Sequence, residues 1–229
     1  MQSMKRFAIY YAPEAGAFAD FAAHWLGWDA AQGVAMPQPH VPGLPRALAC
    51  ITAAPRKYGF HGTIKPPFHL ADGTDADGLH AATAALGASL APVTLPGLAL
   101  RRMGGFVALT PEGDTTALAH LATAVLRRLD AFRAPPGTAE IARRNPDRLT
   151  PSQRENLAKW GYPYVMGDFQ FHLTLTGEMP ETEADTVLQI LAPLVCPLIA
   201  KPFVIDSLCL FGEAADGRFH LMHRYALTG

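Results

Sequence analysis

The sequence contains few of the residues on which disulfide-linked or metal-binding proteins depend. It has only three cysteines, and Cys50, Cys196 and Cys209 form no CxxC pair. A disulfide framework or a cysteine-bound zinc site needs paired or closely spaced cysteines, so neither is expected. The histidines also lack the spacing of a two-histidine, one-carboxylate metal site. We therefore expect no metal and no cofactor.

Long apolar runs and an excess of charge are also missing. No uncharged apolar stretch reaches about 18 residues, so no membrane-spanning helix is predicted. Residues 1–6 lead straight into a strand-like segment, without the apolar core and cleavage site of a signal peptide. We expect a cytoplasmic protein. The net charge is -1, whereas proteins that bind extended nucleic acid are usually basic, so such a partner is not expected.

What the sequence does contain is an internal repeat in a chain with ample material for a core. Hydrophobic residues make up 49% of the 229 residues. An apolar run ending in Pro-Glu occurs at 7–14 and again at 106–112, and the later landmarks His61 and His172 lie about 110 positions apart, as do Leu98 and Leu208. Each run precedes a helical pattern, a second strand, a further helix and a last strand. These later elements are expected at 14–28, 59–65, 75–90 and 98–100 in the first half, and at about 118–129, 169–176, 181–192 and 208–210 in the second.

The repeat predicts the architecture. We expect an α+β fold in which residues 1–229 form one bilobed domain, with pseudo-repeat lobes at roughly 5–103 and 104–226. Two mostly antiparallel sheets would face a central cleft about a pseudo-twofold axis, with helices outside and with strands free to exchange between the lobes. The alternative is an unrelated alternation of strands and helices.

The repeated second strands carry the residues best suited to chemistry. Alternate side chains of a strand share one face, so each strand should present a His and a Thr together. Seven polar side chains share these faces: His61, Thr63 and Lys65 in the first strand, and Gln170, His172, Thr174 and Thr176 in the second. A single His-x-Thr triplet means little, but both copies follow a Phe and occupy the same position of the repeat.

Paired His-x-Thr motifs on repeated strands resemble the 2H phosphoesterases. The strings at 58–68, 160–164 and 171–177 resemble one bacterial branch of that superfamily, associated with phosphonate metabolism. The resemblance covers essentially the whole chain. Members often have a hydrophobic residue after each histidine, whereas this sequence has Gly62 after the first, and we expect that change to loosen the packing behind the site.

The resemblance implies acid–base catalysis without a metal, which two imidazoles can perform because they titrate near neutrality. By similarity to related cyclic phosphodiesterases, His172 is expected to be the base and His61 the acid. The hydroxyls of Thr63 and Thr174 would donate to the non-bridging phosphate oxygens. The alternative for both threonines is that they merely favour strand structure.

Substrate binding is expected from residues near these strands. Residues 30–71 contain no Asp or Glu yet carry four Arg or Lys, and residues 133–159 are rich in arginine. Such runs are often only solvated faces, but both precede a repeated strand. The expected substrate-binding residues are Lys65, Tyr58, Arg56, Arg144, Tyr162, Tyr164 and Thr176. One arginine among Arg56, Arg143, Arg144 and Arg148 is expected to bind a second phosphate.

These features predict a metal-independent phosphoesterase that acts on a small cyclic phosphate or phosphodiester of a sugar or nucleotide. Its partner would be a small phosphorylated substrate. One alternative is an RNA-end 2′,3′-cyclic phosphodiesterase. The other is a non-catalytic module that binds a nucleotide or phosphonate.

Overall fold

A seven-stranded antiparallel sheet runs through the centre of the molecule. The structure, a computed structural model, describes residues 4–229. The strand order is β11-β10-β1-β4-β8-β7-β6. The strands are β1 (Phe7–Tyr11), β4 (Gly62–Phe68), β6 (Leu98–Met103), β7 (Phe106–Pro111), β8 (Leu173–Thr174), β10 (Ser207–Glu213) and β11 (Phe219–Ala226). Two short pairs accompany them: β2 (Trp28–Asp29) with β3 (Val34–Ala35), and β5 (Val93–Leu95) with β9 (Phe203–Ile205).

The expected α+β class is confirmed, and the two expected antiparallel sheets are joined into one. Strands β11, β10, β1 and β4 form one side, and β8, β7 and β6 form the other. They are joined into one sheet because Gly62 of β4 pairs with Leu173 of β8. The N-terminal strand β1 lies between β10 and β4, so both ends of the chain contribute to the same side.

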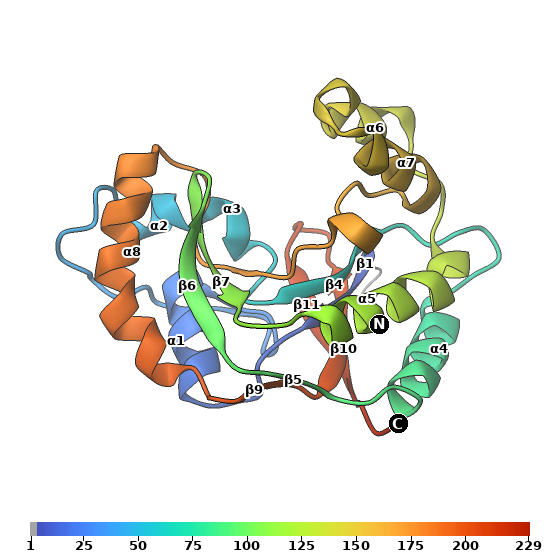
Figure 1. Ribbon diagram of the computed structural model, residues 1–229, viewed down its shortest axis with the longest axis horizontal. Helices are drawn as coiled ribbons and strands as arrows, with labels where there is room; N and C mark the ends of the chain where they lie inside the picture. Colours follow the sequence, from blue (N-terminus) through green and yellow to red (C-terminus); the bar gives the residue numbers. More distant parts are fainter. Residues whose placement is uncertain (1–3) are drawn as a thin grey trace.

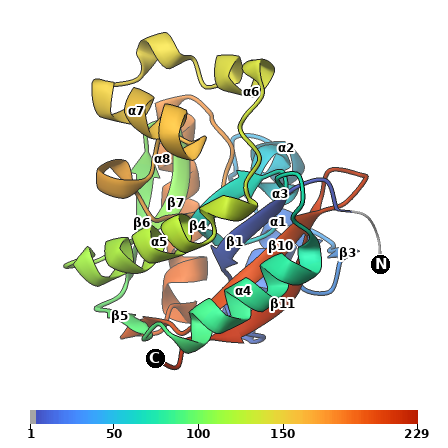
Figure 2. The same ribbon diagram turned by 90° about the vertical axis from the view of Figure 1, so that its right-hand side faces the viewer.

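Helices accompany this sheet, and several of them pack against it. They are α1 (Ala17–Leu26), α2 (Leu48–Ile51), α3 (Ala53–Arg56), α4 (Ala76–Ala88), α5 (Thr116–Arg128), α6 (Thr138–Arg143), α7 (Pro151–Trp160) and α8 (Glu181–Val195), with short 3₁₀ turns at Asp130–Phe132, Pro146–Arg148, Met166–Asp168 and Cys196–Leu198. Helix α4 packs on β10 and β11, α5 on β4, and α8 on β6 and β7. Figure 1 shows α6 and α7 standing beyond the sheet, and Figure 2 shows α4 along β10 and β11. No helix formed by residues 4–229 is long and apolar enough to cross a membrane.

The helices predicted from periodicity are present, and local signals set their ends. Helix α1 stops at Leu26 because Gly27 adopts the left-handed conformation, with φ of 80°. Its Trp25 is fully buried and donates an indole hydrogen bond of 2.8 Å to the carbonyl of Leu175. This bond ties α1 to the segment that follows β8 and holds that segment in place.

Of the two repeated strands, the first begins later than predicted and the second is shorter. Strand β4 begins at Gly62, and of the segment 169–176 only Leu173–Thr174 forms a ladder strand. The alternation of the second segment nevertheless holds, because Phe171 and Leu173 are buried while His172 and Thr174 are partly exposed. Both histidines therefore lie one residue before a strand.

Candidate functional site

The pairing of β4 with β8 brings the two His-x-Thr motifs together. Because Gly62 pairs antiparallel with Leu173, the register places His61 across from Thr174 and His172 across from Thr63. Side chains one position away from a paired residue point to the opposite face. All four therefore share the face turned away from Gly62 and Leu173, and the two histidines are diagonal neighbours, which corresponds to about 7–8 Å between positions.

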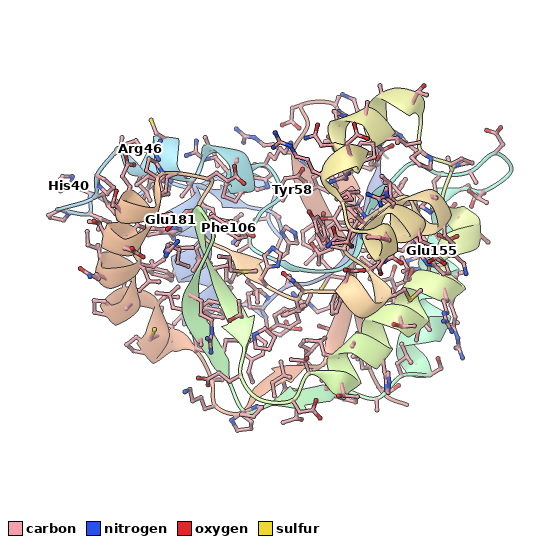
Figure 3. All side chains as sticks on the ribbon, turned by 45° about the horizontal axis from the view of Figure 1, so that its top comes forward. His40, Arg46, Tyr58, Phe106, Glu155 and Glu181 are labelled. Carbon is pink, nitrogen blue, oxygen red and sulfur yellow. The ribbon has the colours of Figure 1, made fainter. Side chains whose placement is uncertain are left out.

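Two adjoining hollows open on this face. His61 lines one of about 360 Å³, together with Thr63 and Thr174, and His172 lines the other, of about 600 Å³. The hollows share Thr63, Pro66, Phe106, Tyr162 and Glu178. Figure 3 shows Tyr58 and Phe106 in the middle of the molecule, between helix α8 and the α6–α7 segment. The two imidazoles thus border neighbouring parts of one depression.

Both histidines are held by the same backbone contact. Nδ1 of His61 lies 2.9 Å from the carbonyl oxygen of Gly59, and Nδ1 of His172 lies 2.8 Å from that of Gln170. A carbonyl only accepts, so Nδ1 carries the hydrogen in each ring. In the neutral imidazole Nε2 then keeps its lone pair and can accept a proton.

Burial shifts the pKa of both imidazoles in the same direction. His61 stacks on Tyr10 with ring centroids 3.8 Å apart, and burial lowers the pKa of His61 to about 4, aided by nearby His172 and opposed by the Gly59 carbonyl. Burial also lowers the pKa of His172, opposed by the Gln170 carbonyl. Loss of hydration disfavours the charged form, so both rings are neutral at pH 7.

The threonines differ in what they touch. Thr63 and Thr174 line the hollow, and within residues 4–229 their hydroxyls make no hydrogen bond, so they are available to a ligand. Thr176 also lines the hollow but is almost completely buried, and its Oγ1 accepts a 2.9 Å hydrogen bond from the backbone nitrogen of Val107. Its hydroxyl is therefore partly committed to holding the chain beside β7.

Lys65 does not share the face of His61, contrary to the prediction. The pairs Tyr10–Thr63 and Ile9–Lys65 show that β4 advances two residues where β1 advances one. This bulge reverses the alternation of side chains. Lys65 is buried instead, with Nζ 3.4 Å from both the Leu126 carbonyl and Asp130. It lines neither hollow beside the histidines.

Arg56 also lies away from the hollows, contrary to the prediction. Its guanidinium donates to the carbonyls of Leu26 at 2.7 Å and Ala49 at 2.9 Å, and to Gln38 at 3.0 Å. Leu26 is the last residue of α1, so Arg56 satisfies a helix-end carbonyl rather than a ligand. Arg143 and Arg148 are exposed and line neither hollow.

The other predicted binding residues do lie at the depression. Tyr58, Tyr162 and Arg144 line the hollow of His61, and Tyr162 and Tyr164 line that of His172. The Arg144 guanidinium carbon lies 4.6 Å from the centre of the Tyr162 ring. Tyr164 is 45% exposed.

Four polar or aromatic residues that line the hollow of His61 were not predicted from the sequence: Arg6, Tyr10, Phe106 and Glu178. Tyr10 and Phe106 belong to the apolar runs that predicted strands, so they were counted as core. Arg6 and Glu178 are isolated charges beside strand segments, and no spacing in the sequence distinguishes them.

Within residues 4–229, no group of three or more histidine, cysteine, aspartate or glutamate side chains could hold a metal ion.

Contrary to the expectation from the sequence, Gly62 does not loosen the packing behind the site. A Cβ at this position would meet the ring of Phe171, at 2.3 Å from its Cζ. Real Cβ atoms do not approach so closely, so the aromatic ring occupies the space that a side chain would fill. The absence of a side chain allows β4 and β8 to meet between the two histidines.

Comparison with known proteins identifies the family. Residues 63–220 match the model of the family described as "Protein of unknown function (DUF1045)". The chain belongs to this family. Two proteins called "Ribose 1,5-bisphosphate phosphokinase PhnN" are similar to it. That of Janthinobacterium sp. (strain Marseille) is 32% identical over 222 residues, or 94% of this chain, and that of Laribacter hongkongensis (strain HLHK9) is 34% identical over 93% of this chain. The chain spans about half of each, 49%.

Solved structures with a similar course of the chain include E. coli LigT complexed with NADP+ and TT0787 of Thermus thermophilus. LigT is 15% identical, with a TM-score of 0.45 and 99% of each chain covered. TT0787 is 11% identical, with a TM-score of 0.43 and 98% of each chain covered.

Proposed function

We propose that this chain is a phosphoesterase that opens a small cyclic phosphate or cleaves a phosphodiester, with its two histidines as acid and base and without a metal. The observation that carries the proposal is the register of β4 and β8, which sets each imidazole across from the threonine of the other motif on one accessible face. Two titrating groups on either side of one phosphorus supply both proton transfers that the reaction needs.

In the proposed reaction the phosphorus lies between His61 and His172. Nε2 of the base takes a proton from water, whose oxygen forms a new bond to phosphorus. The bond from phosphorus to the leaving oxygen breaks, and the acid gives that oxygen its proton. Thr63 and Thr174 donate hydrogen bonds to the non-bridging oxygens, where negative charge accumulates.

We assign His61 as the base and His172 as the acid, which reverses the expectation taken from the resemblance. His61 is enclosed by the stacked Tyr10 ring and by Tyr58, whose ring centroid is 5.9 Å away. This enclosure disfavours the imidazolium and so keeps His61 in the neutral form, which is the form that a base must have. His172 is more open to solvent, so its protonated form costs less.

A small sugar or nucleotide phosphate suits the size of the depression. The hollow at His61 holds about 360 Å³ and is bordered by the rings of Tyr58 and Tyr162. The name of the similar PhnN proteins includes the compound ribose 1,5-bisphosphate. Opening a 1,2-cyclic phosphate of ribose 5-phosphate at O2 would leave this compound, so that cyclic sugar is one candidate, in keeping with the phosphonate-associated branch that the motifs resemble.

The test is a panel of cyclic phosphates followed by ³¹P NMR. It should contain ribose 1,2-cyclic phosphate with and without a 5-phosphate, adenosine 2′,3′-cyclic phosphate with and without a 5′-phosphate, and an oligonucleotide ending in a 2′,3′-cyclic phosphate. We expect turnover of a small member that persists in chelator and is lost in His61→Ala and His172→Ala. Turnover of the oligonucleotide alone, falling steeply with salt, would favour RNA-end processing. Folded protein that opens none of them contradicts the proposal.

A further inference from the structure

We propose that Arg6 and Arg144 form a second anion subsite on the His61 side of the depression, so that the substrate carries a phosphate monoester besides the phosphate that reacts. This inference rests on the proposed phosphoesterase function. Both arginines line the hollow of His61. They come from opposite parts of the chain, one just before β1 and the other directly after α6.

Arg6 is held in a fixed orientation. Its Nε lies 2.5 Å from one oxygen of Glu213 and its Nη2 lies 3.0 Å from the other. This two-point contact fixes the plane of the guanidinium. Within residues 4–229 its Nη1 makes no hydrogen bond, and the side chain is 21% exposed. One edge of the guanidinium is therefore anchored by the protein while another donor remains available at the hollow.

Arg144 is a cation that the described chain leaves without an anionic partner. Its guanidinium lies against the ring of Tyr162 at 4.6 Å, and no residue in 4–229 forms an ion pair or a side-chain hydrogen bond with it. In contrast, Arg133 donates to both oxygens of Asp130 and to the carbonyl of Lys159. The donors of Arg144 are thus free to bind a ligand.

The charges around the two hollows are unequal. Arg6 and Arg144 line only the hollow of His61, whereas among residues 4–229 no Arg or Lys lines that of His172. The exposed carboxylate of Glu178 borders both. Lys57 adds a further cation, with Nζ 4.7 Å from the centre of the Tyr58 ring. The anionic end of the substrate is therefore expected beside His61 and its uncharged end beside His172.

A phosphate monoester matches this subsite better than a single negative charge does. Guanidinium groups present a planar fork of donors that fits phosphate oxygens in pairs. A monoester carries nearly two negative charges at pH 7 and offers three such oxygens. Two arginines that approach from different segments can each take one pair of contacts.

The experiment compares kcat/KM for substrates that differ only in the second phosphate: ribose 1,2-cyclic phosphate with and without its 5-phosphate, and adenosine 2′,3′-cyclic phosphate with and without its 5′-phosphate. We expect the phosphorylated member to be preferred about 10- to 100-fold, the range given by one or two charge-assisted hydrogen bonds. Arg144→Gln should reduce this ratio about tenfold or more. Arg143→Gln, its exposed neighbour, is the matched control and should leave the ratio unchanged.

Arg6 needs a paired variant, because Arg6→Gln alone leaves Glu213 without its partner. The double variant Arg6→Gln with Glu213→Gln removes both charges, and thermal unfolding checks that it folds. We expect it too to reduce the preference. Equal kcat/KM for both members of each pair in the wild type would contradict the proposed anion subsite but not the proposed phosphoesterase activity. A preference retained in both Arg144→Gln and the folded double variant would also overturn it. If no member is turned over, the proposed function fails, and this inference fails with it.

Discussion

Gly62 and Leu173 are direct cross-strand partners, and each follows a histidine immediately. The pair therefore acts as a local twofold centre: one step back along either strand is a histidine, and one step forward is a threonine. No long-range packing is needed to orient the four polar side chains relative to one another once this pair has formed, because the pleat of the sheet decides their face. The geometry of the site depends on how closely β4 and β8 approach.

The first prediction concerns Gly62→Ala. The added Cβ would lie 2.3 Å from the Phe171 ring, so ring and strand must separate. We expect a loss of stability of about 1–3 kcal/mol, as for other overpacked cores, and a loss of activity because the histidines move apart. Urea unfolding and steady-state kinetics measure the two effects.

Two variants control this prediction. Gly137→Ala adds a methyl group where no atom lies within 4 Å and φ is -70°, so it should leave both stability and activity nearly unchanged. Phe171→Leu in the Gly62→Ala background removes part of the obstructing ring and should restore some activity. A Gly62→Ala enzyme as stable and active as wild type would show that the close contact is not required.

The second prediction separates the roles of the histidines. A p-nitrophenyl phosphodiester has a leaving group that needs no proton, so loss of the acid should matter little with that substrate. We expect His172→Ala to lose far less activity on this ester than on a cyclic sugar phosphate. His61→Ala should lose activity on both, since water must still be deprotonated. The opposite pattern would assign the base to His172.

The third prediction is the dependence of kcat/KM on pH. The base must be deprotonated, so activity should fall as pH decreases through the pKa of His61, about 4. The acid must be protonated, so activity should fall as pH rises through the pKa of His172, which burial holds below the ordinary 6.5. A bell with a mildly acidic optimum is expected, because kcat/KM reports the free enzyme. An acidic limb centred near pH 6.5 or above would contradict the enclosure of His61.

The fourth prediction concerns the buried lysine. Burial lowers the pKa of Lys65 to about 8, opposed by Asp130, and the residue lies outside the site. Lys65→Met should therefore keep wild-type kcat/KM and near wild-type stability, since Asp130 retains its 2.8 Å contact with Arg133. Asp130→Ala should cost about 3 kcal/mol, because it leaves two cations without a carboxylate. A large drop in kcat/KM for a stable Lys65→Met enzyme would indicate that Lys65 does bind the substrate.

Patterns that depend on neighbouring residues could be predicted from the sequence. The helical periodicities gave α1, α4, α5 and α8, and the alternation around His172 and Thr174 matches their partial exposure. The repeated slot of His61 and His172 indicated that the motifs meet. Periodicity and repetition are properties of the sequence itself, so they can be recognised without knowledge of the tertiary contacts.

Other features arise only when distant segments meet. A single bulge opposite Ile9 turns Lys65 from the site into the core beneath α5, and a bulge has no signature in the alternation of one strand. Arg56 bonds to a helix end 30 residues away, while Arg6, which no motif marked, borders the hollow. An isolated cation has the same appearance in the sequence whether it meets a carbonyl, a carboxylate or a ligand.

The sequence by itself determined which side chains can do the chemistry, because the strand repeat sets a His and a Thr two residues apart in each half. The tertiary structure alone decided which charged residues accompany them and how near the two motifs come. Register, bulges and ion pairs are settled by contacts between segments far apart in the chain, and their energies depend on burial that only the folded molecule defines.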